Sequence, residues 1–248
     1  MVIPFLSYAW ASTPARLTMA AGVTGGFAVL ARAVRGVSLS GAVGGGLACL
    51  ALFVGAGPGA FATLAALFVA TSVSTRLGYR RKRELGLAER QEGRNATQVL
   101  ANLAVAAAGT VVFGATGKSA WLVAAAAALT EAATDTVASE IGQSRRRDAL
   151  MITTWQRVPA GVDGGITMAG TLAGLGGGIA IASVATSCGM VARRELWIPI
   201  VAGFAGMIVD SLLGATMQRR GWISNEGVNF AATLMAGALG YGMVLVVM

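Results

Sequence analysis

Four acidic residues lie inside long apolar stretches of the chain, where an unpaired charge is costly: Glu131, Asp135, Glu140 and Asp210. Glu131 and Asp135 are four residues apart, so on a helix they share one face. Glu140 lies about 140° round the helix axis from Asp135, and it joins the other two only if the helix ends or bends near Gly142. Carboxylates gathered in this way can hold a Mg²⁺ ion that keeps several water molecules and takes its other ligands from substrate phosphates. The pattern favours a magnesium site, and the alternative is pairing of the carboxylates with arginines of the loops.

Uncharged polar residues accompany these carboxylates. Asn95, Gln98 and Asn102 follow the spacing i, i+3, i+7 and so share one helix face. Further polar residues border the apolar stretches, namely Thr75, Arg76, Asp163, Asn225, Glu226 and Asn229. Polar groups in hydrocarbon are expensive unless they are paired or used, so their number indicates a polar site.

Two glycine patterns have different meanings. Gly170, Gly174 and Gly178 recur every four residues, which is typical of membrane helices that pack closely. The glycines of segment 158–167 stand just before a helix start, where free backbone N–H groups suit a phosphate. A simple loop explains that segment equally well.

The elements that must position these residues are membrane-spanning helices. The chain has 248 residues, of which 55% are hydrophobic and 12% are charged, whereas a soluble domain carries about 25% charged residues. The absence of His excludes a Ser-His-Asp triad and a His-ligated zinc site. We expect an all-α polytopic membrane protein of one domain, residues 1–248, with about eight transmembrane helices. The expected spans are roughly 15–31, 38–55, 59–77, 96–115, 119–141, 164–188, 197–217 and 228–247.

The basic residues provide an independent test of this topology. With eight spans, 15 of the 19 Lys and Arg residues fall on one side of the membrane, which the positive-inside rule assigns to the cytoplasm. Both termini then lie outside, and each intramembrane polar residue lies in the cytoplasmic half of its helix. The sequence therefore predicts a multi-pass protein of the cell (inner) membrane with a cytoplasm-facing site. The net charge of +8 reflects the cytoplasmic loops and not a nucleic-acid partner.

Several motifs in this order resemble one family of membrane proteins. It is the integral-membrane family that contains animal transmembrane protein 19 and the plastid phytyl-phosphate kinase of plants. The matching segments are 75–78, 93–102, 135–142, 152–155, 158–167, 209–218 and 225–229. This chain has Asp163 where the family pattern usually has Asn, and Leu103 where it usually has Gly.

The resemblance implies a membrane isoprenoid-phosphate kinase. Its substrates would be a prenyl or phytyl monophosphate and a nucleoside triphosphate, with CTP favoured, and its cofactor would be Mg²⁺. Asp135, Glu140 and Asp210 are the implied catalytic residues, and together with Glu131 they are the implied metal ligands. The residues implied to bind nucleotide and lipid phosphate are Thr75, Arg76, Lys82, Arg94, Asn95, Gln98, Asn102, Ser139, Gly161, Asp163, Gly164, Gly165, Thr167, Asn225 and Asn229.

Two other classes of protein stay open at this point. A lipid or ion transporter also carries buried carboxylates, but it needs polar residues near the membrane midplane and access from both faces. A CTP-dependent lipid cytidylyltransferase would share the nucleotide and the magnesium but would release pyrophosphate.

Overall fold

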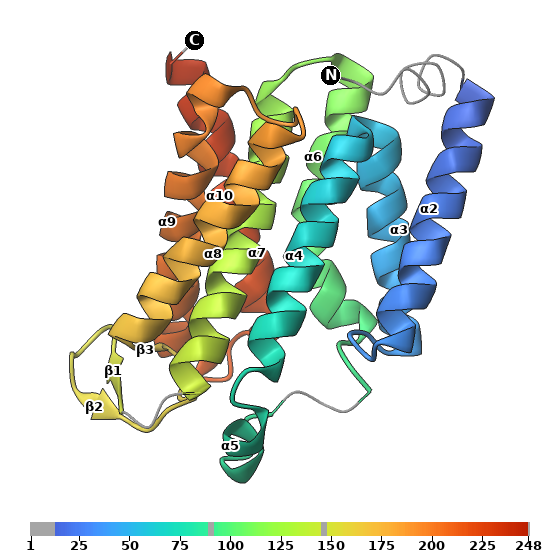
Figure 1. Cartoon of the computed structure of the whole chain (residues 1–248). Coiled ribbons are helices and arrows are strands. Elements are labelled where there is room, and N and C mark those ends of the chain that lie inside the picture. The colour runs from blue at the N-terminus through green and yellow to red at the C-terminus, as the bar shows by residue number, and fades with distance from the viewer. Residues whose placement is uncertain (1–12, 89–91, 145–147, 248) are drawn as a thin grey trace.

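Eight long helices form an up-and-down bundle in the computed structural model, which describes residues 13–88, 92–144 and 148–247 (Figure 1). The helices are α2 (Thr13–Ala33), α3 (Leu39–Ala56), α4 (Pro58–Arg76), α6 (Ala96–Thr116), α7 (Ala120–Ser144), α8 (Met168–Ser187), α9 (Trp197–Leu213) and α10 (Asn225–Val247). Each lies within a few residues of a predicted span, so the prediction of a helical membrane protein is confirmed.

Within the described residues, six helical segments are long and apolar enough to cross a membrane by themselves. They are α3, α4, α6, α8, the α9 segment with its flanking turns, and α10. Helices α2 and α7 fall outside this set. Helix α7 carries Glu131, Asp135 and Glu140, which lower its hydropathy. Eight crossings therefore stay a prediction, although all eight helices are present.

Helix α7 is the central helix of the bundle and packs against α4, α6, α8, α9 and α10. Every residue from 123 to 134 is buried, and many are alanines, which let neighbouring backbones approach. The glycine stripe of α8, namely Gly170, Gly174 and Gly178, faces this helix. A Cβ atom on Gly174 would lie 2.5 Å from the Thr134 carbonyl oxygen and 2.7 Å from the Ala138 Cβ atom. The glycine stripe therefore packs helix against helix and leaves no room for a lipid.

Gly174→Ala is expected to lower the melting temperature and the yield of folded protein. The added methyl group meets the backbone of α7, and overpacking of this kind costs about 1–3 kcal/mol. Gly176→Ala is the matched control, because a Cβ atom there meets nothing within 4 Å. Equal melting temperatures for the two variants would contradict the close packing of α7 and α8.

Two small elements at one end of the bundle were not predicted. Helix α5 (Tyr79–Glu84) follows α4, and a three-stranded antiparallel sheet precedes α8 (Figure 1). Its strands are β1 (Ala149–Met151), β2 (Arg157–Val158) and β3 (Gly165–Ile166), in the order β2-β1-β3. The all-α prediction therefore holds for the bundle, and this small sheet is an addition that the sequence did not indicate. Strands of two or three residues are too short to give an alternating pattern.

Most of the described basic residues belong to segments at the end of the bundle that holds α5 and the sheet. Helix α2 begins and α10 ends at the opposite end (Figure 1). Residues 90 and 145–147, which also enter the charge comparison, lie outside the described residues. The arrangement agrees with a cytoplasmic α5, but the side of the membrane on which α5 lies stays a prediction.

We expect an impermeant thiol reagent to label Cys188 in intact cells, and not a cysteine introduced on α5. Cys188 is exposed at the end of α8 that lies away from α5, and Cys49 is buried and silent. Glu84→Cys, combined with Cys188→Ser, places the single accessible thiol on the exposed side of α5. Labelling of this variant before cell lysis would reverse the proposed orientation.

Candidate functional site

A polar cavity of about 370 Å³ lies at the end of the bundle that holds α5 and the sheet. The start of α6, the second half of α7, segment 160–167, the end of α9 and the start of α10 enclose it. Most of the predicted site residues line this cavity, although they come from five separate parts of the chain. They are Arg94, Gln98, Asn102, Asp135, Ser139, Glu140, Gly161, Asp163, Gly164, Gly165, Thr167, Asp210, Asn225 and Asn229.

Three carboxyl groups form an acidic cluster on the α7–α9 side of the cavity. Asp135 and Asp210 line it, and Glu131 lies one helical turn deeper and is 1% exposed. Their charges act on one another, and Arg94 acts on Asp135. Glu131 Oε1 and Asp210 Oδ2 are buried and make no hydrogen bond in the described part of the chain. Two acceptor oxygens without a donor, in a cluster of like charges, are the environment that a bound cation would relieve.

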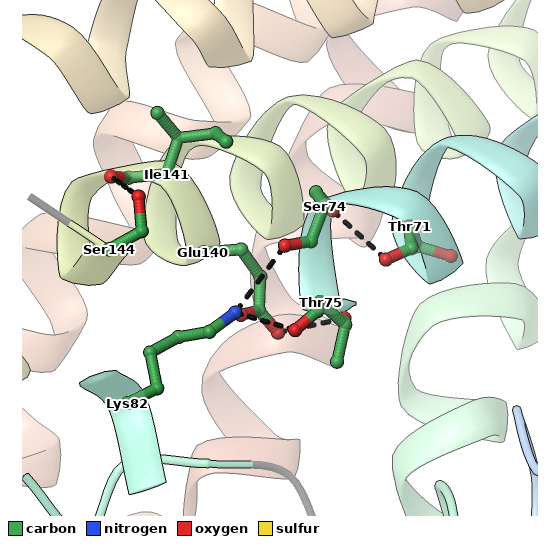
Figure 2. A network of polar contacts seen from close by, with 7 residues as sticks. All are labelled: Thr71, Ser74, Thr75, Lys82, Glu140, Ile141 and Ser144. Atoms are coloured by element: carbon green, nitrogen blue, oxygen red, sulfur yellow. Dashed lines mark hydrogen bonds and ion pairs between the residues drawn. The ribbon is translucent and has the colours of Figure 1, made fainter. Parts of the chain in front are cut away.

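Glu140 lines the cavity, but its carboxylate is engaged by residues of α4 and α5. Lys82 Nζ, from α5, forms an ion pair with Glu140 Oε2, and the Thr75 hydroxyl donates a hydrogen bond of 2.8 Å to Oε1 (Figure 2). Lys82 also donates to the carbonyl oxygens of Thr75 at 2.7 Å and Ser74 at 3.4 Å. Lys82 is 1% exposed, so this pair joins α4, α5 and α7 in the interior.

This ion pair corrects two predicted roles. Helix α7 continues without a break to Ser144, so Glu140 stays off the face that Asp135 occupies and turns to α4 and α5. Both Glu140 oxygens are taken, and the Lys82 ammonium group is engaged, so neither group stands ready for a metal ion or a phosphate. The predicted alternative, pairing with a basic residue, applies to Glu140, with a lysine in place of an arginine.

Three other predicted ligands act as helix caps. Asn95 Oδ1 accepts from the Gln98 backbone N–H at 3.0 Å, and Gln98 Oε1 accepts from the Asn95 N–H at 2.9 Å, which is a capping box. The Thr167 hydroxyl caps α8 by accepting from the Gly170 N–H at 3.0 Å. Asn95 lies outside the cavity lining. These side chains fix where α6 and α8 begin.

The glycines of segment 160–167 shape the cavity wall. Gly161 and Gly164 have φ angles of 85° and 77°, which side chains rarely allow. A Cβ atom on Gly164 would clash with Ala215 in the π-helical turn Gly214–Gln218 that follows α9. The glycines are therefore required by the fold of the loop, and a role in phosphate binding stays a prediction.

Asp163 lines this wall, and the positive charge of Arg219 acts on it. Partial burial raises the pKa of Asp163, and the nearby Arg219 opposes that rise. The Asp163 charge also acts on Asp210. A carboxylate at this place repels phosphate, so we assign it no phosphate contact.

Arg76 lies away from the polar cavity. Its Nη2 atom donates to the Val34 carbonyl oxygen at 2.9 Å, and the residue lines a separate apolar cavity. The predicted role of Arg76 in binding phosphate is therefore not supported by its position. Arg94 is the predicted basic residue that does line the polar cavity.

Five further polar residues line the cavity and were not predicted: Thr136, Gln143, Thr171, Ser211 and Gln218. Gln143 follows Ser139 by four residues, and Thr171 follows Thr167 by four. Helical spacing places Gln143 next to Ser139 and Thr171 next to Thr167 on one face, so the sequence could have indicated these two residues.

Among the described residues, no three His, Cys, Asp or Glu side chains have the geometry of a metal site. A Mg²⁺ ion bound largely by water and substrate phosphates needs one or two carboxylates. Asp135 and Asp210 fit that requirement, with Glu131 behind them.

The fold and the site together define an integral membrane protein with an acidic and amide-rich polar cavity near one end of its helices. The chain belongs to the family described as integral membrane protein DUF92, whose model matches residues 22–237. This match confirms the family predicted from the motifs.

The chain is similar to curated proteins of bacteria, plants and archaea. It is 32% identical to the uncharacterized membrane protein sll0875 of Synechocystis over 75% of this chain and 73% of that protein. It is 28% identical to Protein VTE6, chloroplastic, of Arabidopsis thaliana over 79% of this chain and 62% of that protein. It is 38% identical to the uncharacterized membrane protein MJ0933 of Methanocaldococcus jannaschii, over 44% of this chain and 45% of that protein. No solved structure matches the chain.

Proposed function

We propose that this protein is a membrane isoprenoid-phosphate kinase. It transfers the γ-phosphoryl group of a nucleoside triphosphate, with CTP as the favoured donor, to a prenyl or phytyl monophosphate. The polar cavity is the observation that carries the proposal, because one space is lined by Asp135, Asp210, Arg94 and Asn102 at the end of a membrane bundle. The similarity to a chloroplast protein and the motifs shared with the plastid phytyl-phosphate kinase support it.

The reaction needs little covalent help from the protein. An oxygen of the lipid monophosphate attacks the γ-phosphorus, the bond from that phosphorus to the β–γ bridging oxygen breaks, and the nucleoside diphosphate leaves with the electron pair. The second pKa of a phosphomonoester is about 6, so the attacking phosphate oxygen is already deprotonated at neutral pH. No general base is required, which agrees with a chain that has no His.

The side chains of the cavity then position the reactants and balance their charge. The Arg94 guanidinium group binds phosphate oxygens, which its planar fork suits. Asn102 donates its Nδ2 hydrogen to the Gln98 carbonyl oxygen at 2.9 Å, which orients the amide beside the cavity. Asn225 and Asn229 start α10 one turn apart and are proposed to orient nucleotide oxygens.

Asp135 and Asp210 would hold Mg²⁺, with Glu131 adding negative charge beneath them. When bound, the ion would neutralise the phosphates that the carboxylates otherwise repel. Soluble nucleotide would reach the cavity from the cytoplasm, with both termini of the chain on the other side of the inner membrane.

Purified protein in detergent, incubated with CTP, Mg²⁺ and phytyl or geranylgeranyl monophosphate, tests the proposal through its products. We expect CDP and the prenyl diphosphate, with slower turnover when ATP replaces CTP. Pyrophosphate and a CDP-linked lipid would instead identify a cytidylyltransferase. Absence of any turnover with these prenyl monophosphates would contradict the proposal.

A further inference from the structure

A second cavity, of about 490 Å³, lies among α2, α3, α4 and α6. Its walls are mainly apolar and include Phe27, Ala31, Ala42, Leu64, Leu67 and Phe68. Phe27 and Phe68 meet edge to face, with ring centroids 5.3 Å apart. The volume falls in the range of about 300–1,000 Å³ that is typical of ligand pockets.

This apolar cavity adjoins the polar one. Arg94 and Asn102 line both cavities, so a guanidinium and an amide group stand at the boundary. The backbone of Arg94 is fixed there: its N–H donates to the Gly36 carbonyl oxygen at 3.2 Å, and its own carbonyl oxygen accepts from Ser38 at 2.9 Å. The α2–α3 turn therefore holds Arg94 where a phosphate and a hydrocarbon chain would join.

We infer that the cavity among α2, α3, α4 and α6 holds the hydrocarbon tail of the lipid monophosphate, with its phosphate at Arg94 and Asn102. This inference rests on the proposed function and adds the place of the acceptor. An apolar space that borders the guanidinium group of Arg94 matches an amphiphile with one anionic head. The nucleotide then occupies the polar side, so the two substrates meet from opposite sides of Arg94. The α7–α8 glycine stripe is filled by backbone and side-chain contacts and leaves no comparable space.

Ala42→Leu on α3 tests the inference, because it fills part of the apolar cavity. Val43→Leu is the matched control, because Val43 lies on the same helix, is 60% exposed and does not line the cavity. The measurement is binding of geranylgeranyl and dimethylallyl monophosphate to purified protein without nucleotide, so it does not depend on catalysis.

We expect wild type to bind the longer lipid more tightly than the shorter one. Ala42→Leu should weaken binding of the longer lipid about tenfold or more and leave the shorter one nearly unchanged. Val43→Leu should bind both lipids as wild type does. If Ala42→Leu does not fold, Ala28→Leu on α2 replaces it, with the 71% exposed Val29 changed to Leu as its control.

The two proposals can fail separately. Equal binding of the longer lipid by Ala42→Leu, Val43→Leu and wild type would overturn the tail site, even if phosphoryl transfer is observed. Length-dependent binding that Ala42→Leu abolishes would support the tail site, even if no phosphoryl transfer is observed and the kinase proposal fails.

Discussion

Asp135→Asn is expected to lower the rate of phosphoryl transfer at least about 100-fold, because charge neutralisation at a transferring phosphoryl group is worth several kcal/mol. The substitution keeps the shape of the side chain and removes the charge that a hard cation requires. Folding should be little affected. Loss of the attraction between Asp135 and Arg94 is offset by relief of the repulsion from Glu131 and Asp210.

Thermal melting separates this account from a purely structural role for Asp135. Wild type should gain stability when Mg²⁺ and a non-hydrolysable CTP analogue are added together, and Asp135→Asn should not. Asp148→Asn makes the same change at the same end of the bundle but outside the cavity lining, and it should behave as wild type. If Asp135→Asn melts far below wild type without ligand, the residue is the partner of a structural cation.

Lys82→Met is expected to destabilise the protein by about 3–5 kcal/mol, because it leaves a largely buried carboxylate without its cation. Glu140 would keep one donor, the Thr75 hydroxyl. The double variant Lys82→Met with Glu140→Gln removes both charges and should recover much of the lost stability. Melting temperatures of the two single variants and the double variant give the coupling between the residues.

The same variants decide between two roles for Lys82. In the structure its ammonium group joins α5 to α4 and α7 (Figure 2). The double variant Lys82→Met with Glu140→Gln, once folded, should therefore retain most of the phosphoryl-transfer activity of wild type. A Lys82→Met protein that melts as wild type does and has lost its activity would return Lys82 to the phosphate site.

The sequence was informative wherever local patterns determine structure. The length of the apolar stretches predicted where the helices lie. Polar residues at the same end of successive helices indicated one cavity, and that cavity is lined by residues as distant in the sequence as Arg94 and Asn229. Helical geometry also indicated that Glu140 stands off the face of Asp135. Its partner could not be predicted from spacing, because Lys82 lies 58 residues earlier and reaches Glu140 through the turn that folds α5 back.

Some polar residues that were predicted to bind substrate also have a structural role, which their residue types alone do not reveal. Asn95, Gln98 and Thr167 are predicted to bind substrate, and all three also cap helices, while Gln98 and Thr167 line the cavity as well. An Asn followed three residues later by Gln is itself a capping-box signal, so polarity at a helix start has two meanings. The π-helical turn after α9 approaches Gly164, a contact between distant segments that no local pattern encodes.

Transfer of a radiolabelled γ-phosphate from CTP to phytyl or geranylgeranyl monophosphate tests the central claim most directly. Wild-type protein should place the label on the lipid, in an amount equal to the CDP released, and Asp135→Asn should not. An α-phosphate label should remain entirely in CDP and unreacted CTP. Appearance of the γ-label in pyrophosphate, with the α-label on the lipid, would contradict phosphoryl transfer.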